Sequence, residues 1–301
     1  MKTYDLIIIG SGPAGITASI YAARYKLDFI CIGKEHGGTA NEAFMVENYP
    51  GLPDIPGIEL MKKMKNQAEK IGANIITDDI NTIKKDKEIF SIKTNGEEYG
   101  AKNIILTTGT NRTRLKVPGE EELRGKGVAY CATCDAPLFR NKIVAVVGGG
   151  DAALTAAVQL GDVAEKVYLI ARKDLRGTPA WIDTINKNKK IEVMLGKSLK
   201  EIKGDNKVSS VIIRETGEEI SVNGVFVEIG ATPAIEIIKD LGIELDSSHH
   251  IQIDESQQTN IKGMLAAGDL TTGSNKLKQI VTACSEGAIA ANTVYKIIKR
   301  S

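Results

Sequence analysis

The chain has 301 residues, 42% of them hydrophobic and 26% charged, which is ordinary for a globular protein with room for two domains. Its 39 Lys and Arg nearly balance 38 Asp and Glu, and this net charge of +1 argues against nucleic acid as a partner. No apolar stretch approaches the roughly 20 residues that span a bilayer, and Met1–Asp5 leads directly into an apolar run without room for a signal peptide. We therefore expect a cytoplasmic protein with no membrane segment.

The first part of the chain predicts a strand, a glycine turn, a helix and a second strand. Residues 4–9 form a short β-branched apolar run, which is typical of a buried parallel strand. A helix is expected over about 13–25 and a strand over 28–32. The elements expected next are a loop at Val46-Glu47-Asn48-Tyr49-Pro50-Gly51, a helix at 57–72, antiparallel strands within 74–100 and a strand at 101–106.

The same order returns further along the chain. A strand at 143–147 is followed by Gly148–Gly150, a helix over about 151–161 and a strand at 167–170, with further strands within 191–228. The C-terminal part, with Met264–Asp269 and a helix over about 276–299, has no counterpart in this second unit. We expect it to complete the first unit. The predicted fold class is α/β, with two Rossmann-like, three-layer (ββα) nucleotide-binding domains.

Both glycine turns have the residues that a dinucleotide site needs. In a G-x-G-x-x-G turn the first glycine bends the chain, the second admits the pyrophosphate and the third lets the helix pack on the strand. Gly10, Gly12 and Gly15 fit fully, while the second turn has Gly148, Gly150 and, at the third place, Ala153. A free helix N-terminus then favours the anion. The alternative is a tight turn that holds no ligand.

The residues after each second strand bear on which nucleotide binds. An acid usually accepts a hydrogen bond from the ribose hydroxyls at the end of the first unit's second strand. Gly33 occupies that position here, and Glu35 lies two places later. In the second unit Arg172, Lys173 and Arg176 favour NADPH over NADH, although Asp174 opposes this. A solvated charged turn is the alternative interpretation.

Of the four cysteines, only Cys131 and Cys134 have a spacing with chemical meaning. A zinc site would lack further ligands at suitable spacing, and simple packing would make the spacing a coincidence, so we favour a redox pair and expect no metal. A second thiol is needed to resolve the mixed disulfide formed in thiol–disulfide exchange. Asp135 could carry the proton released with each thiolate, or could instead cap a helix or complement the dipole of its first turn. Cys31 and Cys284 are expected to pack as small hydrophobes.

Taken in order, these motifs resemble the low-molecular-weight thioredoxin reductases, which are FAD-dependent disulfide reductases. The resemblance covers essentially the whole chain. The segments that carry it are Gly10–Gly15, His36–Gly38, Val46–Gly51, Thr107–Thr110, Cys131–Asp135, Gly148–Ala153, Ala266–Asp269 and Lys278–Ile280.

The resemblance implies a discontinuous FAD domain, 1–113 and 243–301, and an inserted NAD(P)H domain, 114–242, that carries the dithiol. It also implies a homodimer, rotation between the domains, and a thioredoxin-like or glutaredoxin-like partner. Cys134 would face the flavin, Cys131 would attack the partner disulfide and Asp135 would serve as the acid–base group. The implied FAD residues are Gly10, Ser11, Gly12, Pro13, Ala14, Gly15, Glu35, Gly38, Thr39, Asn48, Thr108, Gly109, Gly268, Asp269, Lys278, Gln279 and Ile280; those for NADPH are Gly148, Gly150, Asp151, Ala153, Arg172, Lys173 and Arg176.

Three positions depart from the family pattern. Thr39 replaces a frequent glutamine, Lys278 replaces arginine, and Ala171-Arg172-Lys173 lacks the histidine of the basic motif, with Arg176 one place early. The leading hypothesis is a thioredoxin-disulfide reductase that takes electrons from NADPH. Two alternatives are the same acceptor chemistry with ferredoxin, NADH or a deazaflavin as donor, and a flavin-binding redox sensor without turnover. Ferredoxin–NADP reductases share the glycine turns but lack the dithiol.

Overall fold

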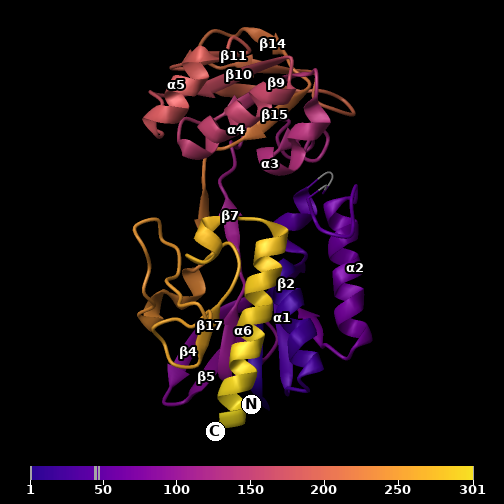
Figure 1. Ribbon diagram of the computed structural model, residues 1–301, viewed down its shortest axis with the longest axis vertical. Coiled ribbons are helices and arrows are strands. Elements are labelled where there is room, and N and C mark those ends of the chain that lie inside the picture. Colours follow the sequence, from indigo (N-terminus) through magenta and orange to yellow (C-terminus); the bar gives the residue numbers. More distant parts are fainter. Residues whose placement is uncertain (1, 44–45, 47, 301) are drawn as a thin grey trace. The chain divides into compact units, whose positions relative to one another are not determined.

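The computed structural model describes residues 2–43, 46 and 48–300, so Glu47 of the expected loop at 46–51 lies outside the described residues. The chain folds into two compact units (Figure 1). The first contains the chain up to Asn41, Ile58–Asn111 and the chain from Thr232 onward. The second contains Glu42–Gly57 and Arg112–Ala231.

A seven-stranded sheet forms the centre of the first unit. Leu6, Ile7 and Ile8 in its middle strand are fully buried, as expected for an apolar run covered on both faces. That strand pairs in parallel with strands on both sides, and the C-terminal strand β17 joins the same sheet in parallel. The order is β3 (Ile75–Thr77), β2 (Phe29–His36), β1 (Lys2–Ser11), β6 (Glu98–Leu106), β5 (Ile89–Thr94) and β4 (Ile80–Asp86), with β17 (Met264–Ala266) also paired to β6.

Two long helices of the first unit run side by side, α1 (Pro13–Arg24) and α6 (Ile280–Arg300) (Figure 1). Small residues let them approach closely, since a β-carbon on Gly287 would collide with the Ala14 carbonyl. The rings of Tyr25 and Tyr295 stack at 4.5 Å between their centroids. The other helical segments of this unit are η1 (Gly38–Glu42), α2 (Gly57–Lys70), η3 (Glu236–Leu241) and η4 (Ser274–Lys276).

The second unit has a parallel sheet between two layers. Val144 and Val146 face one core, which contains Leu154 and Leu160 of α4, while Ala145 and the alternate residues face a three-stranded sheet. This arrangement confirms the predicted three-layer ββα fold. The order of the parallel sheet is β11 (Ile191–Leu195), β10 (Lys166–Ala171), β9 (Ile143–Val147), β15 (Gly224–Val227) and β8 (Val128–Ala129). The three-stranded sheet has the order β12 (Leu199–Lys203), β13 (Ser210–Ile213) and β14 (Glu219–Ser221). The helices are α3 (Ala132–Asp135), η2 (Ala136–Phe139), α4 (Asp151–Val163) and α5 (Pro179–Lys187).

Two boundaries differ from those expected. The chain returns to the first unit at Thr232 rather than 243, because Ile235 and Ile238 are buried in the core of that unit. Helix α6 begins at Ile280 rather than 276, because Ser274, Asn275 and Lys276 all have left-handed backbones, with φ of 49°, 51° and 60°. Where the chain passes between the units, β7 (Thr110–Arg112) pairs with β16 (Ala231–Pro233).

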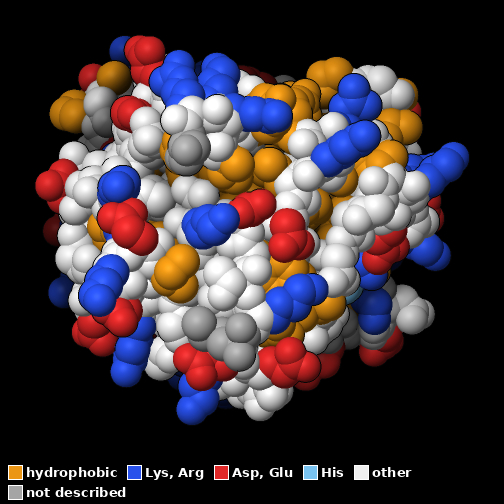
Figure 2. All heavy atoms as spheres, turned by 90° about the horizontal axis from the view of Figure 1, so that it is seen from below, with side chains coloured by type: hydrophobic (Ala, Val, Ile, Leu, Met, Phe, Trp, Pro, Cys, Tyr) orange, Lys and Arg blue, Asp and Glu red, His pale blue; other side chains and the backbone are white. Residues whose placement is uncertain are grey.

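Charge is spread rather than segregated on the face drawn in Figure 2, where Lys and Arg side chains lie among Asp and Glu. The surface ion pairs of the first unit include Lys34–Asp79 and Lys102–Asp5, both with N···O distances under 3 Å. Within the described residues, no helix is both long and apolar enough to span a membrane.

Candidate active site

The first glycine turn is tight at two places and open at the third. A β-carbon on Gly10, which has φ of +109°, would collide with the Thr107 carbonyl, and one on Gly15 would collide with the Gly10 carbonyl. At Gly12 the nearest neighbour would be the Gly37 oxygen at 3.8 Å. Gly12 is also the N-cap of α1, and no side chain caps that end. The turn therefore leaves this helix N-terminus open, as a phosphate-binding turn requires, and phosphate binding here stays a prediction.

The segment 36–39 lies against this turn. Ser11 accepts the Gly37 N–H through its backbone oxygen at 2.8 Å, and a β-carbon on Gly38 would lie 3.7 Å from Gly12. The His36 ring contacts Ser11 Oγ at 3.2 Å and Thr77 Oγ1 at 2.9 Å. Partial burial lowers the His36 pKa. Sequence reasoning did not assign this histidine; its position at the end of β2, beside the expected acid, was the available signal.

The C-terminal segment is brought to the same turn by tertiary packing. A β-carbon on Gly268 would lie 3.2 Å from that of Ala14 and 3.7 Å from that of Ala283 on α6. Cys284 Sγ lies 3.9 Å from the Pro13 oxygen. The predicted FAD residues at 10–15 and 268–269 are therefore neighbours. Next to them is a hollow lined by Gly268, Asp269, Thr271, Gly273, Lys276, Leu277, Lys278, Thr282, Ala283 and Glu286.

Glu286 organises the loop around this hollow and was missed by sequence reasoning. It is 4% exposed and accepts hydrogen bonds from Gly268 N at 2.7 Å, Thr271 Oγ1 at 3.1 Å and Ser274 Oγ at 2.6 Å. A buried carboxylate needs such donors. The signal in the sequence is a lone acid in the otherwise small and apolar stretch 283–291.

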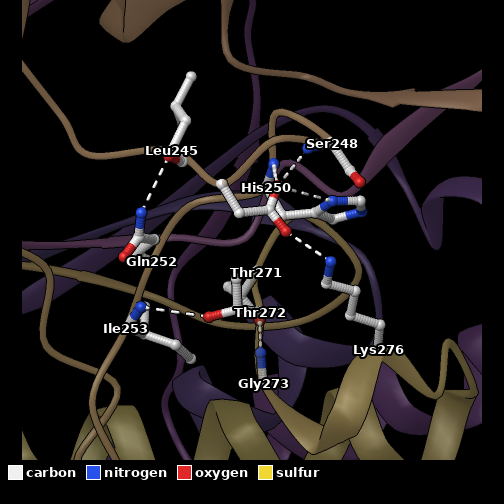
Figure 3. Close-up of polar contacts among 10 residues, drawn as sticks. Leu245, Ser248, His250, Gln252, Ile253, Thr271, Thr272, Gly273 and Lys276 are labelled. Carbon is white, nitrogen blue, oxygen red and sulfur yellow. Dashed lines mark hydrogen bonds and ion pairs between the residues drawn. The ribbon is translucent and has the colours of Figure 1, made fainter.

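A second carboxylate holds the left-handed turn 274–276. Figure 3 shows the Lys276 amine pointing toward the loop that carries Ser248 and His250, where it pairs with Asp246 at 2.5 Å. This pairing and the N–H groups of His250 and Ser248 keep the Asp246 pKa far below its usual value. Three consecutive non-glycine residues in this conformation are costly, and both carboxylates stabilise them.

The remaining predicted FAD residues have diverse environments. Thr282 Oγ1 accepts the Gln279 N–H at 3.1 Å, which fixes the residue directly before the start of α6 at Ile280. The Thr108 hydroxyl donates to the Ala234 carbonyl at 2.7 Å, and Gly109 accepts the Ala234 N–H. Glu35 and Thr39 are exposed. Asn48 belongs to the segment grouped with the second unit, so its contact with a flavin stays a prediction.

The second glycine turn has the same construction as the first. A β-carbon on Gly148 would collide with the Glu228 carbonyl and lie 2.8 Å from Ala153, whereas one on Gly150 would meet nothing within 4 Å. Gly150 is the N-cap of α4, again with no side-chain cap. The predicted residues Gly148, Gly150 and Ala153 therefore form a turn like the first one, and their contact with a nucleotide stays a prediction.

The loop after β10 is fastened to this turn. Asp151 Oδ1 accepts from Thr178 N at 2.7 Å and from Thr178 Oγ1 at 3.0 Å, and Arg176 N donates to the Gly149 oxygen at 2.6 Å. Arg172, Lys173 and Arg176 are exposed. Asp151 has one oxygen engaged with the loop that carries the cations, and its contact with a nucleotide stays a prediction.

Cys131 and Cys134 form a disulfide with their Cα atoms 5.3 Å apart. Cys131 is the N-cap of α3, and its Sγ accepts the Cys134 N–H at 3.2 Å. Asp135 follows and is 4% exposed, without a side-chain cap to the next helical turn. Within the described part of the chain no group of His, Cys, Asp and Glu is arranged to hold a metal ion.

Comparison with known proteins agrees with this geometry. A model of the pyridine nucleotide-disulphide oxidoreductases matches residues 4–287. The chain belongs to the pyridine nucleotide-disulphide oxidoreductase family. It is 40% identical to a thioredoxin reductase of Treponema pallidum, over 98% of this chain and 97% of that protein.

Solved structures of this family share the fold. A thioredoxin reductase from Streptococcus pyogenes is 38% identical, with a TM-score of 0.92 and 99% of both chains covered. A ferredoxin-flavin thioredoxin reductase from Clostridium acetobutylicum is 32% identical, with a TM-score of 0.56 and 100% of both chains covered. The resemblance to the low-molecular-weight thioredoxin reductases is thereby confirmed over the full length of the chain.

Proposed function

We propose that this chain is a thioredoxin-disulfide reductase in which electrons pass from NADPH, through FAD, to the Cys131–Cys134 disulfide and then to a thioredoxin-like or glutaredoxin-like protein. One observation carries the proposal. Two glycine turns each lead into a helix whose N-terminus has no side-chain cap, and the same chain forms a disulfide between two cysteines separated by two residues. Full-length similarity to thioredoxin reductases supports it.

Two features of the first unit support FAD as its cofactor. The open position at Gly12 admits a pyrophosphate, while Gly268, Asp269 and Lys278 line the neighbouring hollow. FAD, when bound, accepts a hydride and passes an electron pair to a disulfide. The residues proposed to hold it are the seventeen that the family resemblance implies, and the chain's own contribution is to orient the cofactor and to exclude water.

The dithiol performs the exchange with the partner protein. The Cys131 thiolate attacks one sulfur of the partner disulfide, forming a mixed disulfide and releasing the other sulfur as a thiolate. Cys134 then attacks Cys131, which restores the intramolecular disulfide and releases the second partner thiolate. The Cys134 N–H already donates to Cys131 Sγ at 3.2 Å, and this contact would stabilise a negative charge on Cys131.

Asp135 is proposed to move the proton that leaves a thiol. It is adjacent to Cys134 and buried, at 4% exposed. Asp135 also lies in the first turn of α3, so complementing the dipole of that helix stays an alternative to this role. A buried carboxyl beside a redox cysteine is a suitable general base.

For the electron donor there are two candidates, NADPH and a donor of another kind. Exposed Arg172, Lys173 and Arg176 on a loop fastened to the second glycine turn favour the 2′-phosphate of NADPH. The similarity to a ferredoxin-flavin thioredoxin reductase, together with the missing histidine before Arg172, favours a donor such as ferredoxin, NADH or a deazaflavin.

The test is to purify the protein, record its flavin spectrum and mix it anaerobically with each donor. Bleaching of the flavin by NADPH on the millisecond scale, and steady reduction of thioredoxin, are expected. Cys131→Ser should abolish turnover but leave flavin reduction intact. A colourless protein that takes up no FAD would overturn the proposal, and bleaching by ferredoxin alone would change the donor. Sedimentation would test the homodimer, which we also propose.

A further inference from the structure

The residue before the dithiol is part of a buried polar cluster within the second unit. Tyr130 is 4% exposed, and its hydroxyl donates to Glu120 Oε1 at 2.9 Å. Glu120 is 3% exposed. The guanidinium of Arg114 lies 4.3 Å from the centroid of the Tyr130 ring. We call Arg114, Glu120 and Tyr130 the tyrosine clamp.

The carboxylate of the clamp is tied to the backbone of the segment that enters the second unit. Leu115 N donates to Glu120 Oε1 at 3.0 Å, and Lys116 N donates to Oε2 at 2.7 Å. Lys116 has a left-handed φ of +57°, a conformation that its surroundings must stabilise. Glu120 thus links the chain entry to the side chain that precedes Cys131.

Both flanks of the dithiol are consequently anchored. On the N-terminal side, Ala129 pairs with Phe226 in the parallel sheet and Tyr130 is clamped by Glu120. On the C-terminal side, the Phe139 and Phe226 rings pack edge to face at 5.0 Å. Anchored flanks keep two thiols close together in the reduced state and so favour closure to the disulfide.

We propose that Glu120 and Tyr130 are positioning residues that set the dithiol–disulfide equilibrium of Cys131 and Cys134. They act through the backbone of residue 131 and touch neither the partner nor the reacting sulfurs. This inference rests on the proposed redox role of the dithiol and extends it, because it assigns part of the reduction potential to a hydrogen bond outside the Cys-x-x-Cys segment.

The reaction to measure is the exchange with glutathione, in which the protein dithiol and one oxidised glutathione give the protein disulfide and two reduced glutathiones. Purified full-length protein is equilibrated over a range of glutathione ratios, quenched with acid, alkylated and weighed by mass spectrometry. The variants are Tyr130→Phe, which removes only the hydroxyl, and Glu120→Gln, which presents a donor to the Lys116 N–H. Tyr168→Phe, on the half-buried Tyr168 of the same unit, is the matched control.

Both clamp variants are expected to shift the equilibrium toward the dithiol by about three- to tenfold, where tenfold corresponds to about 30 mV. Tyr168→Phe should match the wild type. A wild-type ratio in both clamp variants would overturn the inference. If one clamp variant does not fold, as judged by its circular dichroism, the other decides alone. Failure of the wild-type pair to oxidise reversibly would instead refute the proposed function.

Discussion

The Glu286 carboxylate accepts the Gly268 N–H at 2.7 Å, and this contact joins α6 to the loop that follows β17. The same carboxylate accepts from Thr271 and Ser274, so one buried charge on the helix fixes three points of that loop. The loop lines the hollow proposed to hold part of the flavin. Glu286, which is not among the residues predicted to contact FAD, thus holds the loop that forms part of the predicted FAD site.

Substitution Glu286→Ala should weaken both the fold and flavin binding. Of the three donors that lose their acceptor, Thr271 is buried and Gly268 is half-buried, whereas Ser274 is exposed and can bond to water instead. Because a buried unsatisfied group costs about 1–3 kcal/mol, a loss of roughly 3 kcal/mol in unfolding free energy is expected. Flavin affinity of the apoprotein, measured by quenching of flavin fluorescence, should fall at least about tenfold. The neighbouring Ser285→Ala, at an exposed position, is the control. Wild-type flavin affinity in Glu286→Ala would refute this role.

The stability of the first unit should fall on mild acidification through His250. Within the described residues its Nδ1 lies 3.6 Å from Asp246 Oδ1, which is too long for a hydrogen bond, and neither ring nitrogen makes one. Burial, followed by the charge of Lys278, lowers its pKa below 6.5. The unfolded chain therefore binds the proton more readily, and stability is lost as pH falls through about 6.5, by at most about 1.4 kcal/mol per pH unit.

Denaturant unfolding of His250→Asn at several pH values between 7.5 and 5 measures this contribution. The variant should lose part of the pH dependence, because it has no imidazole to protonate. His249→Asn alters the exposed neighbour and should keep the wild-type slope. Identical slopes in all three proteins would show that His250 is not the titrating group.

Thiol reactivity should separate the redox pair from Cys31. Complete burial raises the Cys31 pKa to about 12, so it stays a protonated thiol at neutral pH. After mild reduction, iodoacetamide at pH 8 should label Cys131 and Cys134 and leave Cys31 unmodified, as peptide mass mapping would reveal. Labelling of Cys31 at the rate of Cys131 in folded protein would contradict the structure.

Two alanine substitutions in the second glycine turn should have opposite effects. Gly150→Ala adds a methyl group where no atom lies within 4 Å, so the protein should fold normally but bind NADPH at least about tenfold more weakly. Gly148→Ala collides with the Glu228 carbonyl at φ of +150° and should lower the melting temperature. Isothermal titration and thermal denaturation provide the two measurements. Unchanged nucleotide affinity in Gly150→Ala would argue that this turn is only structural.

The double substitution Arg172→Gln and Lys173→Gln tests the donor. If these cations bind the 2′-phosphate, the KM for NADPH should rise by about tenfold while that for NADH changes little. Lys200→Gln, at an exposed cation of β12, is the control. Equal changes for the two nucleotides would favour a donor other than NADPH.

The sequence alone predicted the two Rossmann-like units, the strand and helix on either side of each glycine turn, and a redox role for the Cys131–Cys134 pair. These features depend on local patterns: an apolar β-branched run, glycines at fixed spacing and two cysteines separated by two residues. Strand 143–147 has the predicted bounds for the same reason.

Only the tertiary structure decided which distant residues meet. Residues 10–15 and 268–287 join because Gly268 and Gly287 let α6 approach α1, and no local pattern reports such a contact. The late start of α6 follows from the left-handed turn at Ser274–Lys276, which Glu286 and Asp246 stabilise from elsewhere in the chain. Likewise, the tyrosine clamp beside Cys131 depends on Glu120. This carboxylate accepts hydrogen bonds from Tyr130 and from the backbone of Leu115 only once the chain has folded and brought these donors to it.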